Sequence, residues 1–195
     1  IFNFLDNNEI GEIESIESSF GFKVRKIDPE SRLFNKDLGG GAILDVGCYP
    51  LSFISLFLEK GENIDFKNVN GEVCHTNVDI DAAADLLINN KVKCKIHVSL
   101  KRYFKNNSII KGTKGTMIIN FPWLPDKKVY LEIFNKNRYY KTFINSDLTV
   151  YANQIKKVSE EFQNIDNTQH KLFDFSKSLE NMKYLDYWMK NINNN

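Results

Sequence analysis

The sequence lacks several features that would assign a function class directly. Its longest apolar run, over residues 51–58, is interrupted by serines and falls short of the roughly 20 residues of a membrane-spanning helix. No basic segment followed by a short apolar stretch opens the chain, so no secretory signal is expected. No G-x-G-x-x-G or G-x-x-x-x-G-K-[ST] motif follows a predicted strand, so these residues alone predict no dinucleotide or nucleotide-phosphate site.

Charge and cysteine content exclude further classes. The formal net charge is +1, which gives no reason to expect binding to nucleic acid or to an anionic membrane surface. Three cysteines, Cys48, Cys74 and Cys94, are an odd number without close spacing, so we expect no disulfide framework and a reducing, cytoplasmic compartment. Neither C-x-x-C nor H-x-x-x-H spacing occurs, so no metal site is expected.

The order of the predicted elements indicates the fold class. Alternating apolar and polar residues predict a half-buried strand over 10–22, with one register irregularity, and a mainly buried helix is predicted over 42–58. Residues 82–88 and 92–100 predict a hairpin around Asn89-Asn90, because asparagine tolerates positive φ. Strands near 69–73, 108–111, 116–120, 129–135 and 139–143 and helices over 151–162 and 179–188 complete an α+β domain with a predominantly antiparallel sheet.

The segment over residues 39–50, GGGAILDVGCYP, has the residue types for proton transfer. In a helix, Asp45 and Tyr49 lie on one face, and Pro50 with Gly47 predicts an interruption there. A phenol and a carboxylate can manage the proton of an alcohol or a carbonyl while a hydride moves. The phenol has an ordinary pKa of about 10, and Asp45 alone would raise it, so this chemistry needs a cation from elsewhere.

A structural explanation of the same residues stays open. An aspartate and a tyrosine four residues apart occur on many helices, and three consecutive glycines can simply form a loop. Spacing alone does not decide between the two interpretations.

The run GGGAILDVGCYPLSFISLF resembles a segment of the Gfo/Idh/MocA oxidoreductases, GGG-A-φ-φ-D-φ-G-x-[HY], where φ is apolar. Tyr49 in place of the more frequent histidine resembles the branch that contains dimeric dihydrodiol dehydrogenase and glucose–fructose oxidoreductase. The likeness continues in order along the chain, through residues 10–16, the KGTKGT turn at 111–116, FPWLP at 121–125 and the two closing helices.

This resemblance implies the C-terminal half of a two-domain enzyme. Residues 1–195 would be the substrate-binding and oligomerisation domain, with helices packed on one face of the sheet and the N-terminal dinucleotide-binding (Rossmann) domain missing. NAD or NADP would be bound mainly by that domain, which also carries the lysine of a Glu-Lys-Pro motif that this sequence does not contain. The 195 residues alone are therefore expected to be inactive.

The resemblance also assigns roles to individual residues. Tyr49 would be the acid/base and Asp45 its partner, while Gly40, Gly41 and Arg32 would lie near substrate or cofactor. The substrate would be a small molecule, a sugar or another cyclic polyol. The open sheet face would pair subunits into a homodimer or homotetramer, with no nucleic acid or membrane as partner.

Alternatives remain for two of these residues and for the function. Arg32 would more often be a solvated surface arginine. Trp123 is equally compatible with a wall for a sugar ring and with core packing. A stand-alone carbohydrate- or protein-binding domain that has lost catalysis is the alternative to an enzyme, although the presence of Asp45 and Tyr49 argues mildly against it.

Overall fold

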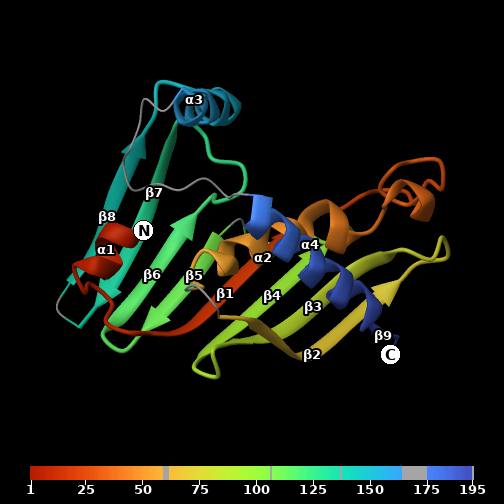
Figure 1. Cartoon of the computed structure of the whole chain (residues 1–195), viewed down its shortest axis with the longest axis horizontal. Helices are drawn as coiled ribbons and strands as arrows, with labels where there is room; N and C mark the ends of the chain where they lie inside the picture. Colours follow the sequence, from red (N-terminus) through yellow and green to blue (C-terminus); the bar gives the residue numbers. More distant parts are fainter. Residues whose placement is uncertain (59–61, 106, 137, 164–174, 195) are drawn as a thin grey trace.

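The computed structural model describes residues 1–58, 62–105, 107–136, 138–163 and 175–194. Its centre is a nine-stranded sheet in the order β8-β7-β6-β5-β1-β4-β3-β2-β9. The helices α2 (Cys48–Ser55) and α4 (Phe175–Lys190) pack against each other and against one face of the central strands (Figure 1). This arrangement confirms the predicted α+β class with helices on one face.

Strand β1 (Ile13–Gly21) joins the two halves of the sheet. It runs parallel to β4 (Val92–Ser99), with Ser15 opposite Lys93, and antiparallel to β5 (Asn107–Gly112), with Ile16 opposite Ile110. A register shift between Ile13 and Ser15 confirms the predicted irregularity. One half of the sheet therefore meets the other only through β1.

The hairpin of β3 (Asp79–Ile88) and β4 forms as predicted. Asn89 and Asn90 both have positive φ, at 49° and 55°, which suits the tight turn between twisted strands. Ala82, Ala84, Leu86 and Ile88 point into the core on one side of β3, opposite Ile96 and Val98 on β4. The remaining elements are α1 (Phe2–Asp6), β2 (Ile64–Val73), β6 (Gly115–Asn120), β7 (Lys128–Asn135), β8 (Arg138–Asn145), α3 (Val150–Phe162) and β9 (Asn193–Asn194).

The glycine-rich segment and the residues beside it form three short helical elements of different types. A 3-10 turn, η1 (Lys36–Leu38), is followed by a π-helical turn, η2 (Ile43–Gly47), and then by α2. In a regular α-helix the ring of Pro50 would crowd the carbonyl of Val46, and the residues just before Pro50 form a wider π-turn instead. The predicted interruption is thus a change of helix type.

Length and composition alone make residues 36–55 compatible with a membrane span. However, 61% of the most apolar window of this segment is buried inside the domain. Ile43, Leu51 and Ile54 have no exposed surface, so the segment serves as the core helix of this fold.

Candidate active site

Tyr49 lies in the first turn of α2, at the edge of an aromatic cluster. Its ring stands edge-on to Phe20 at 5.3 Å between centroids and tilted against Trp123 at 6.0 Å. The side chain is held on these sides, yet the residue keeps 41% of its surface exposed. A fixed phenol that remains accessible can meet a ligand.

The surroundings of Tyr49 keep its hydroxyl protonated. Partial burial raises the pKa of the phenol, and the neighbouring Cys48 and Asp45 raise it further, because negative charge nearby disfavours a phenolate. This agrees with the expected effect of Asp45. In this state Tyr49 is suited to donate a proton.

Asp45 is held by Arg32. The Arg32 Nη1 lies 2.6 Å from Asp45 Oδ1 and donates a hydrogen bond to it. The Asp45 side chain is only 12% exposed, whereas that of Arg32 is 71% exposed. The Arg32 side chain is therefore exposed to solvent and is also held against Asp45. It covers the carboxylate that raises the pKa of Tyr49.

A buried carboxylate, Asp79, fixes the start of this helical segment. Its Oδ2 accepts a hydrogen bond of 2.7 Å from the backbone N–H of Ile43, and only 6% of the residue is exposed. Gly41 has φ +116° and passes so close to Asp79 that any side chain at position 41 would collide with the carboxylate. Sequence analysis missed Asp79, because its burial and its hydrogen bond to Ile43 depend on tertiary packing.

Gly40 and Gly41 are both buried within the loop. Their N–H groups donate to the carbonyl oxygens of Asn35 and Leu33, each at 2.9 Å. The two glycines thus shape the turn that delivers the helix, and their contact with a ligand stays a prediction.

A groove of about 660 Å³ runs beside Tyr49. Trp123 forms part of its wall and is fixed in place, since its Nε1 donates to the carbonyl of Ser19 at 3.0 Å and its ring stands edge-on to Phe53. The ring of Trp123 packs against the core and also faces the groove, and its contact with a sugar ring stays a prediction. The lining residues are Ile1, Cys48, Tyr49, Ser52, Phe53, Leu56, Ile119, Pro122, Trp123 and Asn181.

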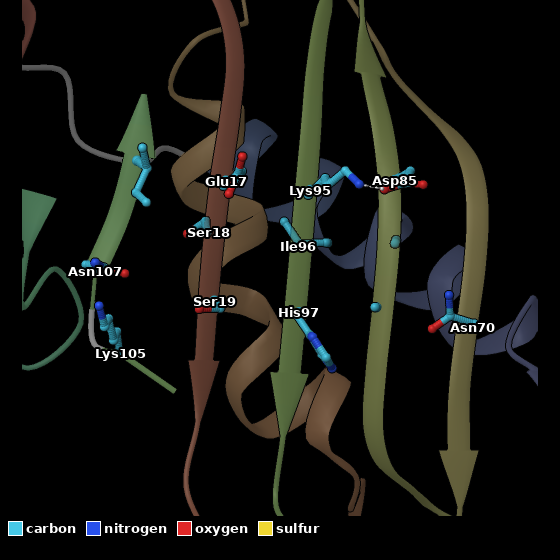
Figure 2. A pocket seen from close by; sticks show the side chains of 13 residues that line it. Glu17, Ser18, Ser19, Asn70, Asp85, Lys95, Ile96, His97, Lys105 and Asn107 are labelled. Carbon is cyan, nitrogen blue, oxygen red and sulfur yellow. Dashed lines mark ion pairs between the residues drawn. The ribbon is translucent and has the colours of Figure 1, made fainter. Parts of the chain in front are cut away.

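The opposite, helix-free face of the central strands has a second hollow, of about 440 Å³. Figure 2 shows Glu17 and Ser19 on β1, Lys95 and His97 on β4 and Asp85 on β3 beside it. This face is polar at its centre, where Lys95 pairs with Asp85 at 3.6 Å.

Near one end of the same face, Asp81 is hydrogen-bonded by Arg102 and lies against His97. Arg102 donates to both of its oxygens, at 2.7 and 2.6 Å, and His97 Nε2 lies 2.8 Å away. Burial alone would raise the pKa of Asp81, but the hydrogen bonds from Arg102 and His97 outweigh it and lower the pKa to about 2. In the described part of the chain, no group of three His, Cys, Asp or Glu side chains is arranged to hold a metal ion.

The family model of the GFO/IDH/MocA C-terminal domain matches residues 2–118. This chain belongs to the GFO/IDH/MocA family. The match includes the glycine-rich segment, Asp45 and Tyr49, so the resemblance inferred from these residues is confirmed.

Individual GFO/IDH/MocA relatives are dehydrogenases and reductases. The trans-1,2-dihydrobenzene-1,2-diol dehydrogenase of Xenopus tropicalis is 32% identical over 124 residues, which are 62% of this chain and 36% of the relative. The dTDP-3,4-didehydro-2,6-dideoxy-alpha-D-glucose 3-reductase of Actinomadura kijaniata is 29% identical over 127 residues, 63% of this chain and 36% of the relative. The matches thus span about a third of these relatives.

A solved structure shares the whole fold. KijD10, a 3-ketoreductase from Actinomadura kijaniata in complex with NADP and TDP-benzene, superposes with a TM-score of 0.83 at 21% identity, covering 98% of this chain and 57% of that one. The likeness in fold to that structure therefore extends beyond the matched residues 2–118 to the C-terminal helices.

Proposed function

We propose that this chain is the substrate-side domain of an NAD(P)-dependent oxidoreductase that acts on a sugar or a cyclic polyol. The observation that carries the proposal is the fixed, accessible and protonated phenol of Tyr49 at the wall of a groove, with Asp45 beside it. The relatives named as dehydrogenases and reductases, and the NADP complex of the structural neighbour, support the same reaction class.

In the reductive direction, Tyr49 donates its hydroxyl proton to the oxygen of a substrate carbonyl; in the oxidative direction, its phenolate takes the proton from an alcohol. A bound nicotinamide supplies or accepts the hydride. Trp123 and Phe20 orient the phenol. Because burial and Asp45 both raise the pKa of Tyr49, the oxidative direction needs a cation, which we assign to the dinucleotide-binding domain.

The described residues do not fit a dinucleotide site of their own. The first strand, β1, leads into the long segment of residues 22–42 and not into a short glycine-rich turn with a helix, and the N–H groups of Gly40 and Gly41 already have backbone partners. This domain would contribute Tyr49 and Asp45 to an active site that it shares with the dinucleotide-binding domain. We therefore expect no turnover from the 195 residues assayed alone.

The test is Tyr49→Phe in the two-domain enzyme, with NAD(P)H assayed against pyranoses and cyclic diols. Losing the acid/base hydroxyl should lower kcat by about 10² or more, while the ring packing is retained. Tyr103→Phe is the matched control, because Tyr103 is exposed and does not line the groove. Unchanged turnover in Tyr49→Phe would remove Tyr49 from the mechanism.

We also propose that the helix-free sheet face pairs two copies of the chain. Ile109 on β5 and Ile118 on β6 lie opposite each other on this face, next to the charged pair of Lys111 and Glu17. On the outer strands, Phe134 and Tyr139 stack at 4.6 Å and remain 41% and 51% exposed. An apolar and aromatic band flanked by charges is typical of a subunit interface.

A further inference from the structure

The apolar side of α3 is turned towards solvent. Four large apolar residues recur along this helix at spacings of three or four, which places them on one face: Tyr151, Ile155, Val158 and Phe162. These four residues form the α3 stripe, and they keep 69%, 69%, 56% and 89% of their surfaces exposed. Figure 1 shows α3 near one end of β7 and β8, away from α2 and α4.

The side of α3 that faces the sheet is mostly polar. Between this side and the strands β7 and β8 lies a hollow of about 450 Å³, and five α3 residues line it: Val150, Asn153, Gln154, Lys157 and Val158. Of the α3 stripe, only Val158 reaches this hollow. A helix that packs on its own domain normally turns its apolar side to the core. Because α3 does the reverse, the stripe indicates a contact with something outside the described residues.

The α3 stripe begins next to the candidate active site. Partial burial is the main cause of the raised pKa of Tyr49, and the phenol of Tyr151 is among the nearby groups that raise it further. Tyr151, in the first turn of α3, therefore lies close to the accessible side of Tyr49. A protein domain that approaches Tyr49 from solvent comes next to the start of the stripe.

The proposed reaction requires such a neighbour. The nicotinamide and the cation for Tyr49 both have to come from a dinucleotide-binding domain, since the described residues do not fit a dinucleotide site. Only 57% of the KijD10 chain is covered by this one, so that reductase has enough further chain to form a second domain. A domain that brings a cofactor to Tyr49 lies on the same side of the protein as Tyr151.

We propose that the α3 stripe is the docking surface for the dinucleotide-binding domain of the same enzyme. The proposal rests on the proposed function, because that domain is the occupant of the surface. Contact along the stripe holds the domain where its nicotinamide and its cation reach Tyr49. The apolar side chains of Ile155 and Phe162 are then buried in the centre of the contact, where interfaces are poorest in charge.

Amide hydrogen exchange, followed by mass spectrometry, tests this contact in the 195-residue chain and in the two-domain enzyme without substrate. Peptides from α3 should exchange about tenfold more slowly in the two-domain enzyme, because docking stabilises a helix that is otherwise exposed. Ile155→Lys places an ammonium group in the middle of the stripe and should abolish this difference. Gln163→Lys adds the same charge at an exposed position beside the end of α3, outside the stripe, and should preserve it.

The 195-residue chain distinguishes other occupants of the α3 stripe. Here Ile155→Lys should leave the Tm and the sedimentation coefficient unchanged, because the side chain is exposed. A lower Tm would show that the chain itself covers the stripe, and a smaller species would show that a second copy covers it. Either result would overturn the proposal.

Two exchange results would also overturn it: equal exchange of α3 in the two proteins, or an equal loss of the difference in Ile155→Lys and Gln163→Lys. None of these measurements depends on turnover. A failure of the proposed proton transfer would instead appear as unchanged turnover in Tyr49→Phe, with the slow exchange of α3 retained.

Discussion

The Asp79 carboxylate accepts a 2.7 Å hydrogen bond from the backbone N–H of Ile43, which ties the first residue of β3 to the first residue of the π-turn. Burial raises the pKa of this carboxyl group from 3.8 to about 6, although hydrogen bonds from the backbone at Ile43 and Ala42 act in the opposite direction. The start of the helical segment that carries Tyr49 is thus hydrogen-bonded to the Asp79 carboxyl group, whose negative charge is unfavourable in this buried position.

The raised pKa of Asp79 predicts how stability depends on pH. The folded state holds the Asp79 proton up to about pH 6 and the unfolded state only to about 3.8, so the stabilising effect of protonation is complete below pH 3.8. As pH rises towards 6, the Asp79 contribution to the free energy of unfolding should fall by up to about 3 kcal/mol. Asp79→Asn should lack this component when urea unfolding is measured across that range. An equal change in wild type and variant, with exposed Asp147→Asn as control, would contradict the prediction.

Gly41 and Gly39 test the close approach of the loop to Asp79. Both have positive φ, at +116° and +72°, but only at Gly41 does an added Cβ meet the carboxylate. Gly39→Ala should cost about 1 kcal/mol from backbone strain. Gly41→Ala should cost about 1–3 kcal/mol more, because Asp79 must move. Chemical denaturation measures both, and equal losses would show that the contact with Asp79 carries no energy.

Replacing Asp45 should change the titration of Tyr49. Since the carboxylate raises the pKa of the phenol, Asp45→Asn should lower it, while partial burial still acts to raise it. The measurement is a pH titration of the Tyr49 ring signal by NMR, assigned by its absence in Tyr49→Phe. Arg32→Ala removes the cation that covers Asp45 and should shift the same pKa upwards. Shifts of the same sign in both variants would argue against an electrostatic link.

The proposed sheet-to-sheet pairing is tested by adding charge at its centre. Ile109→Lys puts an ammonium opposite Ile118 and should convert a dimer or tetramer into a smaller species in analytical ultracentrifugation. Leu38→Lys is the control, because Leu38 is 62% exposed on η1, away from the sheet. A monomeric wild type, or an assembly that Ile109→Lys leaves intact, would refute this interface.

Local sequence patterns predicted most of the elements but not all of their neighbours. The hairpin at Asn89-Asn90 and the strands after it follow from alternation and turn chemistry, which act over a few residues. The parallel pairing of β1 with β4 joins Ser15 to Lys93, far apart in the sequence, and no local pattern specifies it. Prediction of the fold class depended instead on the order of helices and strands.

The residues of the candidate site likewise differ in whether a local sequence pattern predicts them. Asp45 and Tyr49 are recognisable because they are four residues apart in one motif. Asp79 comes from another element, and it matters through its burial and its hydrogen bond to Ile43. Those properties depend on tertiary packing, so the sequence alone gave no reason to select this residue.

The central place of β1 has a consequence for synthesis on the ribosome. Residues 13–21 are translated before both of their partners, β4 and β5, which lie beyond residue 91. A nascent chain must carry this half-apolar segment unpaired while some seventy further residues are added, which on general grounds slows folding and exposes the segment to aggregation. Strand β1, which joins the two halves of the sheet, therefore depends on a chaperone or on an earlier-folded neighbour to protect it from aggregation until its partner strands have been made.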